Sequence, residues 1–222
     1  MADRLALSEG SRYGIVLVLL ACAVGTAIVS PPGALSSLIT AILQGVSVLV
    51  AINPRSGARP RLALLAIVLL SVGGTALVGG GGSLARGIAD LLNAAAIVVL
   101  PVIVVARFRR NLYVSVQAVL GAVCIYLVMG MLFASIDSAI SHLTGQAFFA
   151  GSPQVSSSEY MYFSFITLTT VGYGDLTPGT GAARALAVVE ALVGQLYLVT
   201  VIALIVGNFG RAREPRRGAG PR

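Results

Sequence analysis

The stretch that decides the fold is Thr167-Leu168-Thr169-Thr170-Val171-Gly172-Tyr173-Gly174-Asp175. Gly172 and Gly174 tolerate backbone angles that other residues avoid, so successive carbonyl groups can be aimed the same way. A dehydrated cation needs such a cage of oxygens. The five residues from Thr170 to Gly174 span roughly 15 Å when extended, which is room for a file of several ions. Such a loop can bind cations through its backbone carbonyls, with the Thr170 hydroxyl adding an oxygen, and Val171 and Tyr173 can point backwards and brace the loop against its scaffold. Because one loop supplies one wall, four copies must meet around an axis.

The segments on either side favour a membrane pore over an ordinary surface turn. The run from about Ser157 to Thr169 can form a short helix before the loop. The run from about Ala182 to Phe209 is apolar and long enough to cross a bilayer, since a crossing takes about 20 mostly apolar residues. A Gly-Tyr-Gly surface turn would not need either neighbour.

Composition points the same way. The chain is 57% hydrophobic and 10% charged, with a mean hydropathy of +0.93, which is typical of membrane proteins. We predict an all-α integral membrane protein with six transmembrane helices, a re-entrant pore helix and a filter loop, and no soluble domain. The first span belongs to this repeated pattern and is not expected to be a removed signal peptide. The six predicted spans are about 13–30, 34–52, 61–79, 86–106, 112–136 and 182–209.

The basic residues predict the orientation. All fifteen are Arg, and only Arg86 and Arg184 fall on the side of the filter loop. The positive-inside rule therefore places both termini in the cytoplasm and the filter at the outer face. The net charge of +7 is explained by topology and by contact with anionic inner-leaflet lipid, so no nucleic-acid partner is expected. The other thirteen are Arg4, Arg12, Arg55, Arg59, Arg61, Arg107, Arg109, Arg110, Arg211, Arg213, Arg216, Arg217 and Arg222.

From about Leu112 to Phe209 the chain resembles the pore domain of potassium channels, with outer helix, turret, pore helix, filter and inner helix in order. The resemblance implies a homotetramer in the cell membrane that conducts K⁺ passively and has no cofactor. It implies a four-helix region at 1–110, a pore domain at 111–210 and a basic cytoplasmic tail at 211–222, with no soluble ligand-binding domain. It also implies ion sites in the filter and an outer-mouth carboxylate; these residues are Thr170, Val171, Gly172, Tyr173, Gly174 and Asp175.

Other pore positions are expected to support or gate the pathway. Many members carry a Trp pair where this chain has Tyr162 and Phe163, and Phe163 cannot donate a hydrogen bond to Asp175, so the bracing behind the filter must differ. Gly194 falls where the family often has a hinge glycine; close helix packing is the alternative. Residues on one face of the inner helix are expected to line the cavity and form an inner constriction: Gln195, Leu198, Ile202 and Val206.

Glu190 stands out because an acid inside a transmembrane helix is costly. We predict that it is protonated or fully hydrogen-bonded and braces the pore helix; a gating or pH role is the alternative. The expected partners are Tyr162, Ser164 or Thr167.

The first four spans do not have the residues of a voltage sensor. Such a sensor needs several Arg or Lys crossing the field, and the middle of the fourth span is neutral. Arg86 is expected to pair with Asp90 one turn later, and weak or no voltage gating follows. The segment from about Asp137 to Ser158 is predicted as an extracellular turret. It carries His142, which is expected to be a solvated loop residue or, alternatively, an external proton sensor.

Two other classes of protein are considered. An intramembrane enzyme would need a nucleophile elbow, paired intramembrane aspartates or a zinc motif, and none occurs. A non-conducting scaffold or channel-modifying subunit remains the alternative to a channel.

Overall fold

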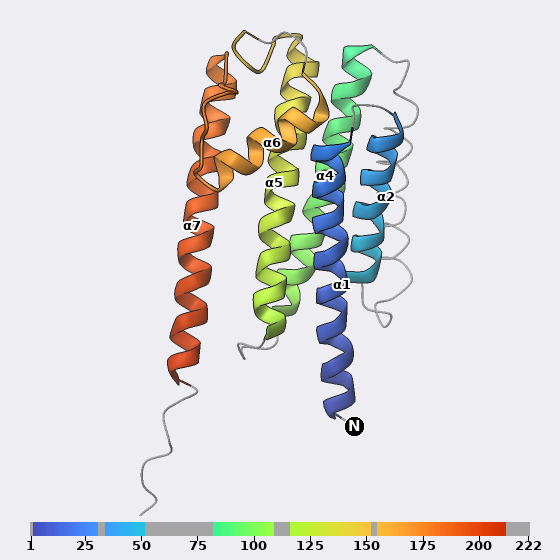
Figure 1. The fold of residues 1–222 in the computed structure, drawn as a ribbon, viewed down its shortest axis with the longest axis vertical. Helices are drawn as coiled ribbons and strands as arrows, with labels where there is room; N and C mark the ends of the chain where they lie inside the picture. Colours follow the sequence, from blue (N-terminus) through green and yellow to red (C-terminus); the bar gives the residue numbers. More distant parts are fainter. Residues whose placement is uncertain (1, 31–33, 52–81, 109–115, 152–154, 212–222) are drawn as a thin grey trace, which may run out of the picture.

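The computed structural model describes residues 2–30, 34–51, 82–108, 116–151 and 155–211. Its helices form a bundle with one short oblique member, as Figure 1 shows. The described residues form no β-strand, so the expected all-helical class holds for them. The helices are α1 (Ala2–Val29), α2 (Ala34–Ala51), α4 (Ser83–Phe108), α5 (Val116–Thr144), α6 (Ser157–Leu168) and α7 (Gly181–Arg211).

Two of the described helices are long and apolar enough to cross a membrane, judged by length and composition. They are Val119–Thr144 within α5 and Gly181–Leu204 within α7. The segments Tyr13–Val29 and Leu38–Val50 are apolar but shorter. Five of the six predicted spans fall on helices. The remaining one, the third predicted span at 61–79, lies outside the described residues.

The outer helix of the pore region is longer than expected. The turret was predicted to begin at Asp137, and this boundary is wrong because α5 continues to Thr144. Polar residues in the last turns of α5 do not end the helix because they face a partner. Ser138 and His142 lie one turn apart and both contact Asp90 of α4. The non-helical turret is therefore confined to the segment between α5 and α6.

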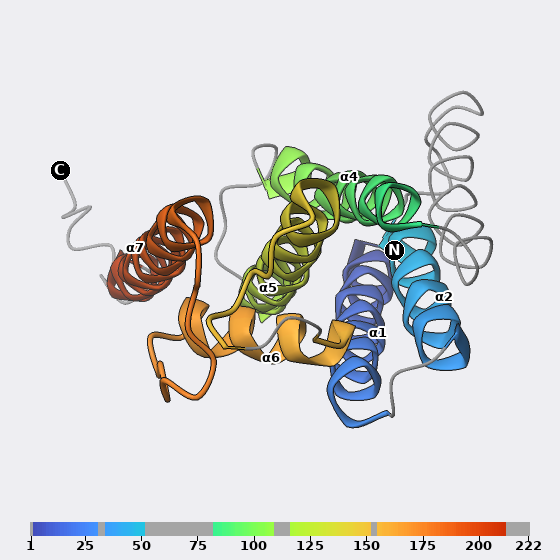
Figure 2. The ribbon, with the colours of Figure 1, turned by 90° about the horizontal axis from the view of Figure 1, so that it is seen from above.

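The pore elements lie at one edge of the chain. Viewed from above in Figure 2, α7 lies at one side, α1, α2 and α4 lie at the other, and α5 lies between them. Helix α5 packs against α1, α4, α6 and α7, whereas α7 packs against α5 and α6. Large apolar side chains of α7 are consequently exposed in the single chain, among them Leu192, Leu196 and Val199.

An aromatic cluster fixes the start of α6 against the turret. The ring of Phe149 lies 5.0 Å from that of Phe163 and 5.3 Å from that of Tyr160. Phe148 packs edge-on against Phe149 at 5.0 Å. All four residues are buried. Such pairs contribute about 0.5–1.5 kcal/mol each beyond their buried area, which anchors the pore helix at its outer end.

Candidate ion pathway

Helix α6 (Ser157–Leu168) leads directly into the loop from Thr170 to Gly174 and is capped at its amino end. It starts at a capped residue, because the Ser156 amide donates to Glu159 Oε2 at 2.6 Å. A carboxylate near the first turn also complements the helix dipole. The helix ends at Leu168, and Thr169 is its C-cap. The filter sequence begins immediately afterwards.

The filter backbone alternates between two kinds of φ angle. Thr170, Gly172 and Gly174 have φ of 59°, 52° and 81°, whereas the residues between them do not have positive φ. Thr170 is the one non-glycine residue with positive φ among those described. Such a conformation costs a non-glycine residue of order 1–3 kcal/mol and persists where the surroundings enforce it. In a regular strand successive carbonyls point to opposite sides, but alternating the sign of φ turns them to the same side.

Hydrogen bonds to the end of α6 set the direction in which the carbonyls point. The Thr170 amide donates to Thr167 O at 2.9 Å. The Val171 and Gly172 amides donate to Ile166 O at 2.8 Å and 3.1 Å. In a planar trans peptide the C=O is directed opposite to the N–H. The carbonyls of Thr169, Thr170 and Val171 therefore point away from α6, free to meet an ion.

The filter side chains are not braced within the single chain. Val171 is 52% exposed and Tyr173 is 73% exposed. In the single chain these side chains therefore have no bracing contact, and the expectation that they brace the loop against its scaffold stays a prediction. Any contact that covers these side chains has to come from another molecule.

Tyr162 supplies the bond that Phe163 cannot make. Its hydroxyl donates to Asp175 Oδ2 at 2.9 Å, which joins α6 to the outer end of the filter. This hydrogen bond raises the pKa of Tyr162 above its ordinary value, so the hydroxyl keeps the proton that it donates. Phe163 instead packs in the aromatic cluster and is buried.

Glu190 is fully buried and contacts α6 from behind the filter. Of its three expected partners, it contacts Ser164, whose Oγ lies 2.5 Å from Glu190 Oε1. The same Oγ lies 2.7 Å from the Gly130 carbonyl, which can only accept. The single hydroxyl hydrogen of Ser164 cannot serve two acceptors at once. If both contacts are hydrogen bonds, the second proton belongs to Glu190, so the arrangement favours the neutral acid.

Asp137 is a second buried acid that sequence reasoning missed. It is fully buried, and neither carboxylate oxygen has a hydrogen-bond partner among the described residues. An ionised carboxylate without partners would be very costly in such a place, which favours the neutral form here too. Because Asp137 lies among serines, the sequence predicts that the turret begins there. The apolar run before Asp137 is the one sequence feature that favours a continuing helix.

The carbonyl of Leu168, just below the filter, is held from two sides. Tyr126 of α5 donates its hydroxyl to Leu168 O at 3.0 Å. Gly194 of α7 lies against the same carbonyl, and a Cβ at Gly194 would overlap it and come within 2.9 Å of Leu168 Cδ1. Gly194 is therefore a position of close packing. A hinge at Gly194 would require motion of α7, which these contacts do not test, so the hinge stays a prediction.

The predicted cavity face of α7 is mostly uncovered. Gln195 and Ile202 are exposed, and Leu198 is half-buried. Val206 lies in α7, but its side chain is outside what the structure describes. A pore-lining and gating role for these residues stays a prediction.

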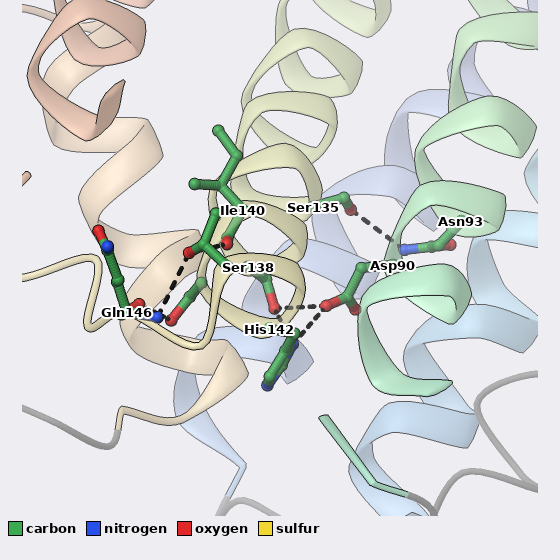
Figure 3. Close-up of polar contacts among 9 residues, drawn as sticks. Asp90, Asn93, Ser135, Ser138, Ile140, His142 and Gln146 are labelled. Atoms are coloured by element: carbon green, nitrogen blue, oxygen red, sulfur yellow. Dashed lines mark hydrogen bonds and ion pairs between the residues drawn. The ribbon is translucent and has the colours of Figure 1, made fainter. Parts of the chain in front are cut away.

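A polar cluster joins the first turns of α4 to the last turns of α5, as Figure 3 shows. Asp90 Oδ2 accepts from Ser138 Oγ at 2.7 Å and lies 2.8 Å from His142 Nδ1. The expected Arg86–Asp90 pair does not form, and Arg86 is exposed. The expectation of a solvated turret histidine is also wrong, because the extended α5 carries His142 to Asp90.

Comparison with known proteins agrees with this geometry. Residues 121–210, which contain most of α5 and all of α6 and the filter, match a family described as "Ion channel". "Probable potassium channel protein 2" of Methanocaldococcus jannaschii is 48% identical over 54 residues, covering 22% of this chain and 16% of the relative. "Protein LctB" of Bacillus caldotenax is 38% identical over 84 residues, 35% of this chain and 61% of the relative.

A human relative extends the similarity. "Potassium voltage-gated channel subfamily A member 7" is 30% identical over 97 residues, 40% of this chain and 19% of the relative. The chain thus spans between about a sixth and three fifths of the lengths of these relatives. Through its pore region the chain is therefore similar to ion channels, among them potassium channels, which are membrane channels and not enzymes.

Proposed function

We propose that the protein is a potassium-selective channel in which four identical chains surround one pore. The observation that carries the proposal is the backbone from Thr169 to Gly174. Its φ angles alternate in sign, and its first amides bond back to α6. Carbonyl oxygens aligned in this way can replace the hydration shell of a K⁺ ion. The ion sites are Thr170, Val171, Gly172, Tyr173 and Gly174, with Asp175 at the outer mouth, and K⁺ is the transported ion.

The exposed surfaces of the single chain support the assembly of four copies. One chain provides one wall of carbonyls, so a single copy cannot surround an ion. The filter and α7 lie at one edge, where Val171, Tyr173 and the apolar side chains of α7 are uncovered. A neighbouring copy would cover these side chains, and lipid would cover the rest of α7.

Passive conduction with weak voltage dependence fits the four-helix region. Residues 94–100 in the middle of α4 are Ala, Ile, Val and Leu, so no charge there crosses the field. The topology that we propose has both termini in the cytoplasm of a cell with the chain in its plasma membrane, and anionic lipid at the inner face. A non-conducting scaffold or channel-modifying subunit is the competing function.

A pair of glycine substitutions tests the proposal. Gly172 and Gly145 have φ of 52° and 67°, and a Cβ would meet no atom within 4 Å at either. Alanine should therefore impose similar backbone strain at both sites, but only Gly172 lies in the filter. We expect Gly172→Ala to abolish potassium-selective flux into vesicles and Gly145→Ala to retain it. Equal flux in both variants, or no flux from the parent protein, would contradict the proposal.

A further inference from the structure

The outer halves of α1, α2, α4 and α5 and the start of α6 line a cavity of about 140 Å³ that is partly open to the surroundings. It lies well away from the filter, between the four-helix region and the pore region. A cavity needs about 10–15 Å³ of such volume per water molecule, so this one has room for about ten. Solvated ions or small polar molecules fit a space of that size.

The described side chains that line the cavity supply oxygen atoms and no basic group. Hydroxyls come from α2, α5 and α6 and from Ser30 just after α1, and Gln44 and Asn93 supply amides. Asp90 is the one charged residue among the described lining residues. This chemistry suits a cation and disfavours an anion.

Several of these oxygens have no partner. Gln44 is only 9% exposed, yet its side-chain amide makes no hydrogen bond to a described residue. Asn93 donates its Nδ2 to Ser135 Oγ at 3.2 Å, which leaves its oxygen available. Asp90 uses Oδ2 for both Ser138 and His142, so Oδ1 is left without a described partner (Figure 3). The described side-chain oxygens that are buried without any partner belong to Asp137 and Glu190, so those of Gln44, Asn93 and Asp90 face the pocket, where water or an ion can bind them.

We propose that this cavity binds a small monovalent cation, with the Asp90 carboxylate as its charged ligand and the oxygens of Gln44 and Asn93 as neutral ligands. A single carboxylate among neutral oxygens suits a singly charged ion. Sites for Ca²⁺ take six to eight oxygens, several of them from carboxylates. An alkali ion and a primary ammonium group share the required chemistry. The ligands come from α2 and α4, and Ser135 and Ser138 of α5 line the same cavity, so the bound ion lies where α2 and α4 face α5.

Rubidium provides a direct test because it scatters anomalously and also enters potassium sites. Crystals of the full chain grown with Rb⁺ should show a peak in the cavity, within ligand distance of Asp90, in addition to peaks in the filter. Asp90→Asn keeps the shape and removes the charge, so the cavity peak should disappear while the filter peaks remain. Arg86→Gln also removes one charge, of the opposite sign, from the same helix without touching the cavity, and should keep both sets of peaks. Filter peaks without a cavity peak would overturn this inference alone, and a cavity peak without filter peaks would contradict the proposed function alone.

Thermal unfolding at a fixed potassium concentration shows whether the cavity prefers an alkali ion or a primary ammonium group. Adding Na⁺ or methylammonium should raise the unfolding temperature of the parent protein, since a ligand that binds the folded state stabilises it. The preferred cation acts at the lower concentration. Asp90→Asn should weaken this response by roughly tenfold or more, since a charged partner is lost. Should Asp90→Asn not fold, Gln44→Met removes one oxygen at constant length and should weaken the response several-fold. A response unchanged in these variants, or absent from the parent, would refute the site.

Discussion

Ser164 Oγ of the pore helix lies 2.5 Å from Glu190 Oε1 of the inner helix, and both residues are fully buried. The contact joins α6, which leads into the loop from Thr170 to Gly174, to α7, the helix that follows this loop. Because Ser164 also bonds the backbone of α5 at Gly130, one hydroxyl links three elements. We infer that this link holds the filter from behind.

Substitutions at Glu190 should separate hydrogen bonding from charge. Glu190→Gln keeps a donor next to Ser164 and is expected to assemble and conduct like the parent. Glu190→Ala leaves Ser164 with one partner fewer, at a cost of about 1–3 kcal/mol per subunit. We expect shorter openings or faster loss of conduction in single-channel recordings of Glu190→Ala. Equal behaviour of both variants and the parent would eliminate the bracing role.

Tyr162→Phe should weaken the outer end of the filter. The variant removes the hydroxyl that donates to Asp175 and keeps the ring, a loss of about 0.5–1.5 kcal/mol per subunit. Faster decline of potassium current during sustained opening is the expected result. Tyr197→Phe is the matched control, because Tyr197 donates to Ala122 O on α5 at 2.7 Å, away from the filter. If both variants lose current at the same rate, the Tyr162–Asp175 bond has no special effect.

Gly194→Ala tests the close packing below the filter. The added methyl group would overlap the Leu168 carbonyl, so we expect loss of tetramer stability and of conduction. Gly25 lies in α1 and has no atom within 4 Å of an added Cβ. Gly25→Ala should instead stabilise the helix by about 0.5–1 kcal/mol. The measurement is the unfolding temperature of both variants. A stable Gly194→Ala channel with altered opening alone would favour a hinge over packing.

Conductance should depend little on voltage. Moving one charge through the membrane field contributes about 2.3 kcal/mol per 100 mV, and the middle of α4 carries no charge to move. Arg86→Gln should leave the conductance–voltage curve unchanged, because Arg86 is exposed and does not pair with Asp90. A steep curve that Arg86→Gln flattens would show that α4 senses voltage.

The helical class and the unusual φ angles of the loop from Thr170 to Gly174 could be predicted from sequence because they depend on local rules. Glycine at alternate positions signals the unusual φ angles, and long apolar runs signal helices. The arrangement around Asp90 could not be predicted in this way. His142 and Asp90 lie 52 residues apart, and whether His142 reaches Asp90 depends on where α5 ends. The polar residues after Asp137 predict a loop, but Ser138 and His142 contact Asp90 of α4, and α5 continues to Thr144.

The choice of Ser164 as the partner of Glu190 also required the structure. Tyr162, Ser164 and Thr167 are all plausible donors on the same short helix. Which of them meets α7 depends on the angle at which α6 crosses it. Similarly, the exposure of Val171 and Tyr173 follows from the filter's place at the edge of the chain. No local pattern reveals that place.

The reversal potential of the purified protein in a planar bilayer, with potassium on one side and sodium on the other, tests the potassium-selective pore most directly. A filter of aligned carbonyls should pass potassium far better than sodium, so the reversal potential should lie far from zero, with the sign set by potassium. The same preparation should have the mass of a tetramer in detergent. A reversal potential near zero would contradict the assignment of Thr170 to Gly174 as a potassium-selective filter, and a complete absence of current would favour the non-conducting alternative.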